Sequence, residues 1–226
     1  MYIGEKGIGF KSVFMAAWKV HIQSGYFSFS FVHRKGDSGM GMVRPMWEEA
    51  KEDLPHPLTR ITLFLHDYED PTQHRDMRAA IRKEFREIQA PMLLFFRHIK
   101  AIDVRIYDDD ARQEHMASFR LQNGKLQNQK ILETTEASGD ATIVSSESQI
   151  YHVQKHTVTD LPRNENRTLS ADEEASRSYA KSEILLAFPL TANSEPIVKP
   201  QKVFAFLPMR QMGFNVSYSR SEADRI

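Results

Sequence analysis

Hydrophobic and polar residues alternate along much of the chain, which is the pattern of β-strands with two different faces. The alternation is clearest in residues 19–34, where Phe27, Phe29 and Phe31 lie on one side and serines on the other. Ser24–Gly25 predicts the turn between two strands there. Further strand-like runs occupy residues 40–47, 59–66, 99–107, three segments up to residue 158, and residues 182–190 and 202–209.

Helical periodicity occurs in few places. Phe10–Trp18 predicts a short helix with its apolar side chains on one face. Asp70 and Pro71 predict the start of a longer helix, with Asp as the N-cap residue and Pro in the first helical position. Its apolar row is Met77, Ile81, Phe85 and Ile88, and Pro91 interrupts it before a second short helical turn.

Together these patterns predict an α+β fold, a two-layer α/β sandwich with a largely antiparallel sheet and few helices. Residues 161–178 contain almost no apolar side chains and predict a linker or surface loop. We therefore expect four segments, which are a first domain at 1–110, a β-rich extension at 111–160, a flexible linker at 161–181, and the start of a second β-containing module at 182–226.

Composition narrows the class of protein. Of the 226 residues, 41% are hydrophobic and 27% are charged, which is ordinary for a globular protein. Thirty basic and thirty acidic residues cancel, so net charge favours neither nucleic acid nor an acidic membrane. The absence of cysteine excludes disulfide scaffolds and cysteine zinc sites. With no signal-peptide pattern and no bilayer-length apolar run, we expect an intracellular protein, cytoplasmic or nuclear, without a membrane partner.

The segment with the clearest candidate chemistry is IGEKGIGFKSVF, residues 3–14, in which three glycines precede an apolar segment. Glycines allow close backbone approach, and amides that open a helix attract phosphate. A P-loop would require lysine directly after the second glycine, where Phe10 stands, and a Rossmann loop would require a third glycine at Ser12. A structural glycine turn before a core helix is the simpler alternative.

The sequence of this segment resembles the Gly-x-x-Gly-x-Gly lid of the GHKL superfamily. These are the Bergerat-type ATPases, which include DNA gyrase, histidine kinases and the ninety-kilodalton heat-shock chaperones. It is most similar to the sacsin and NO VEIN branch. The resemblance implies ATP with Mg²⁺ as cofactor and an incomplete Bergerat-type sheet. It also implies nucleotide contacts from Thr59, which opens the LTRITLFL strand, and from the lid residues Gly4, Gly7, Ile8, Gly9, Phe10, Lys11 and Ser12.

In that family, the catalytic acid, the magnesium-binding asparagine and the adenine-binding Asp-x-Gly-x-Gly box lie before the lid, where this sequence has three residues. No residue here is assigned to catalysis or to a metal. Hydrolysis requires a base for the water and a metal on the phosphates. We therefore expect an ATPase-family fragment that is inactive alone and binds ATP weakly, with a protein partner or the missing half covering the sheet. The alternative is a non-catalytic interaction module.

Three other groups of residues could indicate a binding site, but each has a simpler structural explanation. His152 and His156 have the spacing of a helical zinc site, but their surroundings alternate like a strand. The acidic run 108–110 is typical of a solvated hairpin turn. The basic side chains of the helix from residue 71 could bind nucleic acid, but interleaved acidic residues favour a solvated face, so we do not expect nucleic-acid binding. Those basic residues are Arg75, Arg78, Arg82, Lys83 and Arg86.

Overall fold

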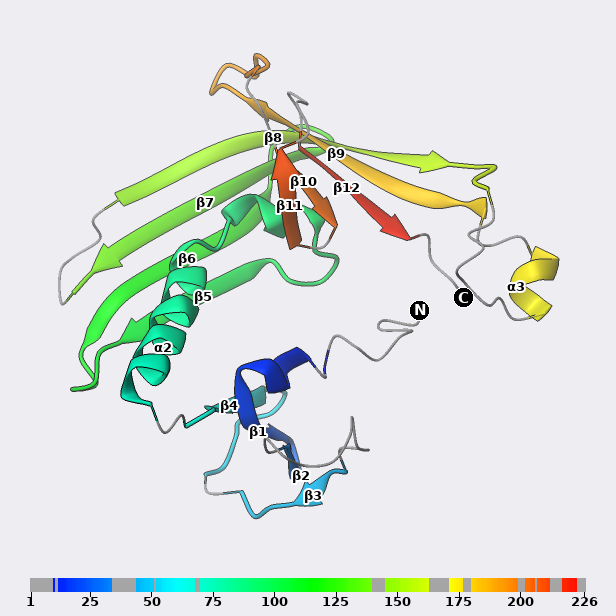
Figure 1. Cartoon of the computed structure of the whole chain (residues 1–226). Coiled ribbons are helices and arrows are strands. Elements are labelled where there is room, and N and C mark those ends of the chain that lie inside the picture. The colour runs from blue at the N-terminus through cyan, green and yellow to red at the C-terminus, as the bar shows by residue number, and fades with distance from the viewer. Residues whose placement is uncertain are drawn as a thin grey trace. The chain divides into compact units, whose positions relative to one another are not determined.

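The structure is a computed structural model of the whole chain. It describes residue 10 and residues 12–33, 44–50, 52–67, 70–139, 145–162, 171–176, 180–198, 202–205, 207–211 and 217–222. Two compact units, Tyr2–Ile81 and Arg82–Ile226, divide the chain. Figure 1 shows the elements of each unit.

The first unit is built on a four-stranded antiparallel sheet with the strand order β3-β2-β1-β4. The predicted hairpin is present, and Gly25 takes a positive φ of 53° in its turn. The helix expected over Phe10–Trp18 is wrong in its second half, because β1 already includes Trp18 and pairs with strands on both sides. The elements are η1 (Ser12–Met15), β1 (Ala17–Ser24), β2 (Phe27–Val32), β3 (Met46–Trp47) and β4 (Thr59–Leu65).

Helix α2 (Pro71–Arg86) begins where the sequence predicts, and the boundary between the two units falls within it. The carboxylate of Asp70 accepts a hydrogen bond from the backbone N–H of Thr72 at 2.9 Å, which is N-cap geometry. The helix has an apolar row, but none of its residues is buried.

The second unit contains an eight-stranded sheet with the order β11-β10-β12-β9-β8-β7-β6-β5. Neighbouring strands are antiparallel except for β10 and β12. Figure 1 shows β5 to β9 as long strands side by side. The elements are η2 (Ala90–Phe95), β5 (Ala101–Tyr107), β6 (Gln113–Asn123), β7 (Gln129–Ser138), β8 (Ser145–Val158), α3 (Ala171–Ser176), β9 (Ser182–Leu190), β10 (Lys202–Ala205), β11 (Leu207–Gln211) and β12 (Ser217–Glu222).

The core of the second unit forms where the short helix η2 packs against β5 to β9. Leu93, Leu94 and Phe95 of η2 are buried there. The strands contribute Val104, Ile106, Ala117, Phe119, Leu121, Leu132, Tyr151 and Ala187. The two sheets and few helices confirm the predicted α+β class. Strand β9 pairs with β8 over its whole length, so residues 182–190 belong to the same sheet as 101–158.

Candidate functional site

Three of the predicted nucleotide-contact residues lie in the described part of the chain: Phe10, Ser12 and Thr59. The remaining ones, which are Gly4, Gly7, Ile8, Gly9 and Lys11, lie outside the described residues. The described three come from the first unit, where Ser12 opens η1 and Thr59 opens β4. The strand register of the first unit's sheet therefore determines whether these residues lie on the same face.

Phe10 packs against the sheet through an aromatic cluster. Its ring lies 5.1 Å from that of Phe31 and 6.1 Å from that of Phe14, both in edge-on arrangements. Phe31 is on β2 and also contacts Phe29 at 5.5 Å. The chain at residue 10, directly after the glycine segment, thus lies against the sheet face that carries Phe31.

Thr59 lies on that same face. Its Cα is opposite Ser24 of β1, and the two hydroxyl oxygens are hydrogen-bonded at 2.7 Å in an exposed position. Side chains two residues apart on a strand share a face, so Ser24 is on the side of Val20, whose partner on β2 is Phe31. The strand register therefore brings the Thr59 hydroxyl and the Phe10 ring to one face of the sheet.

We call this the apolar face, because most of its side chains are hydrophobic. Val20 of the central strand β1 is 0% exposed, whereas Ile61 of the edge strand β4 is 59% exposed and Phe27 is 65% exposed. The face is therefore covered at Val20 and open along β4 and at Phe27. The face consists of Val20, Ile22, Ser24, Phe27, Phe29, Phe31, Trp47, Thr59, Ile61 and Leu63.

Phe10 and Thr59 lie at different levels of the apolar face. Phe10 packs on Phe31, which pairs with Val20, whereas Thr59 pairs with Ser24. Four residue steps separate Val20 from Ser24, which is about 13 Å along a strand. A ligand that contacts both the segment before Phe10 and Thr59 would have to lie along this face.

The opposite face, the serine face, is polar and covered along β2. Ser28 and Ser30 are 4% and 1% exposed, because residues 46–48 lie beside them. Glu48 anchors this segment by accepting hydrogen bonds from the Ser30 hydroxyl and from Lys19 Nζ, the latter at 3.0 Å. The Ser30 bond, followed by the Lys19 bond, holds the pKa of Glu48 below its ordinary value. The sequence pattern did not reveal this anchor.

The serine face also contains a serine–histidine pair. His21 Nε2 and Ser28 Oγ are hydrogen-bonded at 3.0 Å, as in a nucleophile with its base. The Ser28 side chain is too deeply buried for a substrate to reach. We therefore assign the pair to holding β1 against β2, not to catalysis.

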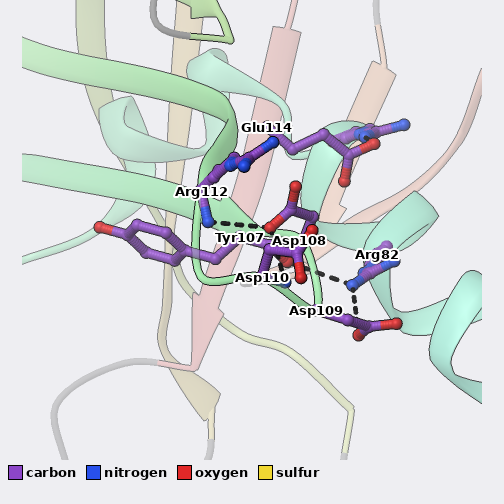
Figure 2. A network of polar contacts seen from close by, with 8 residues as sticks. Arg82, Tyr107, Asp108, Asp109, Asp110, Arg112 and Glu114 are labelled. Carbon is purple, nitrogen blue, oxygen red and sulfur yellow. Dashed lines mark hydrogen bonds and ion pairs between the residues drawn. The ribbon is translucent and has the colours of Figure 1, made fainter.

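The acidic run at residues 108–110 forms the predicted hairpin turn between β5 and β6. Figure 2 shows Asp108 in its centre, where one carboxylate oxygen accepts the backbone N–H groups of Asp110 at 3.0 Å and Arg112 at 2.8 Å. Asp109 points to Arg82, whose guanidinium also donates to the carbonyl of Tyr107 at 3.1 Å. The carboxylates thus shape the turn and bind arginine.

The basic residues of α2 and the two histidines are also accounted for by the fold. Arg82 and Arg86 form ion pairs with Asp109 and Glu114. His152 and His156 are both on strand β8, where four residues span about 13 Å, too far to share a metal ion. No group of three potential metal ligands occurs among the described residues. Within the same part of the chain, no helix has the length and apolar character needed to cross a membrane.

Comparison with protein-family models, curated protein sequences and solved structures gave no significant match. The assignment of a candidate site is therefore based on the residues of this chain alone. Of these, the apolar face, with the Phe10 contact at one level and the Thr59–Ser24 hydroxyl pair at another, is the part best placed to receive a ligand.

Proposed function

We propose that this chain carries part of the nucleotide-binding site of a GHKL-type ATPase, similar to the sacsin and NO VEIN branch of chaperone-like intracellular proteins. In this proposal the amides of Gly4, Gly7 and Gly9 contact the phosphates. Thr59 contacts the base end of ATP. The apolar face lies beneath the nucleotide or beneath the protein layer that encloses it.

The observation that carries the proposal is the shared face. Phe10, the residue after the last glycine of the lid segment, packs on Phe31. Thr59 is 49 positions away in the sequence, and the β1–β4 register brings its hydroxyl to the same side of the sheet. If Thr59 and Phe10 were on opposite faces, one ligand could not contact both regions. The shared face is therefore necessary for the proposed site.

The residues present support nucleotide contact but not hydrolysis. A nucleotide base could hydrogen-bond to the Ser24–Thr59 hydroxyl pair, since hydroxyls both donate and accept. In contrast, the described residues contain no cluster that fits a magnesium ion. We therefore derive no metal-assisted step from this chain, and we expect weak nucleotide binding without turnover until a partner or a further segment supplies the acid, the asparagine and the Asp box.

Glycine-selective nuclear magnetic resonance tests this proposal directly. The chain has ten glycines, so ¹⁵N-glycine labelling gives a spectrum in which each amide is resolvable. Titration with ATP to millimolar concentration should shift the amides of Gly4, Gly7 and Gly9 and leave Gly124 and Gly139 of the second unit in place. Thr59→Val should weaken the response by removing the hydroxyl at nearly constant shape.

Two results would contradict the proposal. Equal shifts at all glycines, or none at millimolar ATP, would remove the phosphate role of the glycine segment. Steady ATP turnover by the purified chain would contradict the assignment of this chain as an inactive part of the site. A Lys11→Ala variant serves as a check on electrostatics, because a lysine that contributes to phosphate binding should raise affinity most at low salt.

A second candidate is a non-catalytic protein-interaction module, and the exposure of the apolar face favours it. Phe27, Trp47 and Ile61 are each more than half exposed on one surface. Contiguous exposed apolar patches commonly mark interaction surfaces. An ATP titration without glycine shifts, combined with a defined protein complex through this face, would select this function over nucleotide binding.

A further inference from the structure

Strand β4 differs from the other edge strands of the two described sheets. Native proteins protect sheet edges with short strands, charges or proline. Strand β3 has two residues and follows Pro45, β5 carries Asp103 and Arg105, and β11 contains Pro208. Strand β4, TRITLFL, has seven residues, no proline and a single charge. It is a long edge without those protections.

The backbone of β4 has hydrogen-bonding groups on its free side. His66 donates its backbone N–H to the carbonyl of Ala16, so His66 faces the β1 side of the ladder. Strand residues face alternate sides with their N–H and C=O groups, so Phe64, Thr62 and Arg60 also face β1. Ile61 and Leu63 therefore direct their backbone groups away from β1, toward the open edge.

The side chains along this edge are apolar and accessible. Ile61 is 59% exposed, Leu63 is 44% exposed and Phe64 is 39% exposed. The one charged side chain, Arg60, is already paired with Glu52 at 2.9 Å. The edge therefore offers backbone donors and acceptors, hydrophobic side chains and no unbalanced charge.

From these observations we infer that β4 is a self-association edge, which pairs antiparallel with β4 of a second copy of this chain. The inference does not depend on nucleotide binding. A two-fold axis at Thr62 places Ile61 opposite Leu63 of the other copy, so the outward backbone groups of both strands meet. The same axis places Thr62 opposite Thr62 and Arg60 opposite Phe64.

This register is self-complementary. Aliphatic pairs, threonine pairs and a cation beside an aromatic ring are favourable cross-strand neighbours, and no like charges oppose each other. The pairing also continues the β1–β4 ladder, so two four-stranded sheets become one eight-stranded sheet. A different occupant, such as an extended peptide, would use the same backbone groups but would not produce a symmetric dimer.

Sedimentation of the full chain over a concentration series tests the inference. We expect a reversible dimer that is lost in Ile61→Lys, which puts a charge at the edge, and in Leu63→Pro, which removes an outward N–H without breaking the β1 ladder. Phe27→Lys is the matched control, because Phe27 is exposed on the same face but not at this edge. Circular dichroism checks that each variant is folded.

A cysteine cross-link tests the register itself. The chain contains no cysteine, so Thr62→Cys introduces a single thiol. In the proposed register the two Thr62 Cα atoms form a non-hydrogen-bonded pair at about 4.5 Å, within the range of a disulfide. Thr59→Cys is the control, because its two copies would be about 20 Å apart along the strands.

The outcomes are decisive. A dimer that survives Phe27→Lys, is lost in both edge variants and cross-links through Thr62→Cys but not Thr59→Cys supports β4 pairing. A monomer at every concentration overturns it. A dimer that is lost in Phe27→Lys and kept in Ile61→Lys also overturns it, because association would then occur through the apolar face instead of the edge.

Discussion

Burial of the Tyr151 phenol predicts a loss of stability at alkaline pH. Tyr151 lies on β8 in the core of the second unit, with 5% of the residue exposed. Burial raises the pKa of Tyr151 to about 12, compared with the ordinary value of 10.0. The cause is that the core solvates a phenolate poorly.

The sign and size of the effect follow from linkage. The folded chain holds the Tyr151 proton more tightly than the unfolded chain, so this contribution to stability is complete below about pH 10 and is lost as pH rises toward 12. A difference of two pH units corresponds to about 2.7 kcal/mol at most, at 1.36 kcal/mol per unit. Near pH 11 the expected loss is about 1.4 kcal/mol, since the unfolded phenol is then mostly ionised and the folded one is mostly neutral.

Urea unfolding of the wild type and of Tyr151→Phe measures this contribution. The variant keeps the aromatic ring and removes the ionisable hydroxyl, so it should lose about 1.4 kcal/mol less than the wild type between about pH 8 and pH 11. Tyr26→Phe is the control, because Tyr26 is 99% exposed and the fold does not enclose its hydroxyl. If wild type and Tyr151→Phe lose stability in parallel over this range, the phenol is not held neutral by the fold and the argument fails.

Three smaller changes test other parts of the structure. Gly124→Ala should destabilise the β6–β7 hairpin by about 1–3 kcal/mol in urea unfolding, because an added Cβ would lie 2.8 Å from the Cβ of Gln129; unchanged stability would show that the hairpin can yield. Glu48→Gln should make stability depend less on pH in the acid range. The lowered pKa of Glu48 stabilises the fold above about pH 4.5, and this contribution is lost as pH falls through the pKa of Glu48 in the folded chain. An unaltered dependence of stability on pH would count against the role of Glu48 as an anchor. Asp108→Ala should cost about 1–2 kcal/mol by removing the acceptor of two backbone N–H groups, whereas Asp110→Ala should cost less than about 0.5 kcal/mol; equal thermal stability of the two variants would contradict this assignment.

Local patterns predicted the elements of this fold well where neighbouring residues determine them. The alternation of residues 27–32 predicted a strand, and Asp70 with Pro71 predicted the start of α2. The same alternation did not say which face is covered. Ser28 and Ser30 are buried because Glu48, 18 residues beyond Ser30, folds back over them, and a pattern with a period of two contains no information about such a distant partner.

The candidate site shows the same division between local and distant information. The glycine spacing and the threonine at the start of a strand are visible in the sequence. That Thr59 faces the same side as Phe10 depends on the register of β4 against β1 and of β1 against β2, which is a property of pairings across the sheet. A shift of one residue in the β1–β4 register would move the Thr59 side chain to the serine face.

The two proposals use different parts of β4, so their experiments can be read independently. Nucleotide contact uses the Thr59 hydroxyl on the apolar face, whereas self-association uses the outward backbone groups of Ile61 and Leu63. Because the Ile61 side chain lies on the apolar face, the comparison uses the wild-type chain below and above the concentration at which it dimerises, and the glycine shifts with ATP should be the same in both. If ATP shifts the glycines only in the dimer, the second copy must contribute to the site, and the nucleotide would then occupy a surface that both sheets build together.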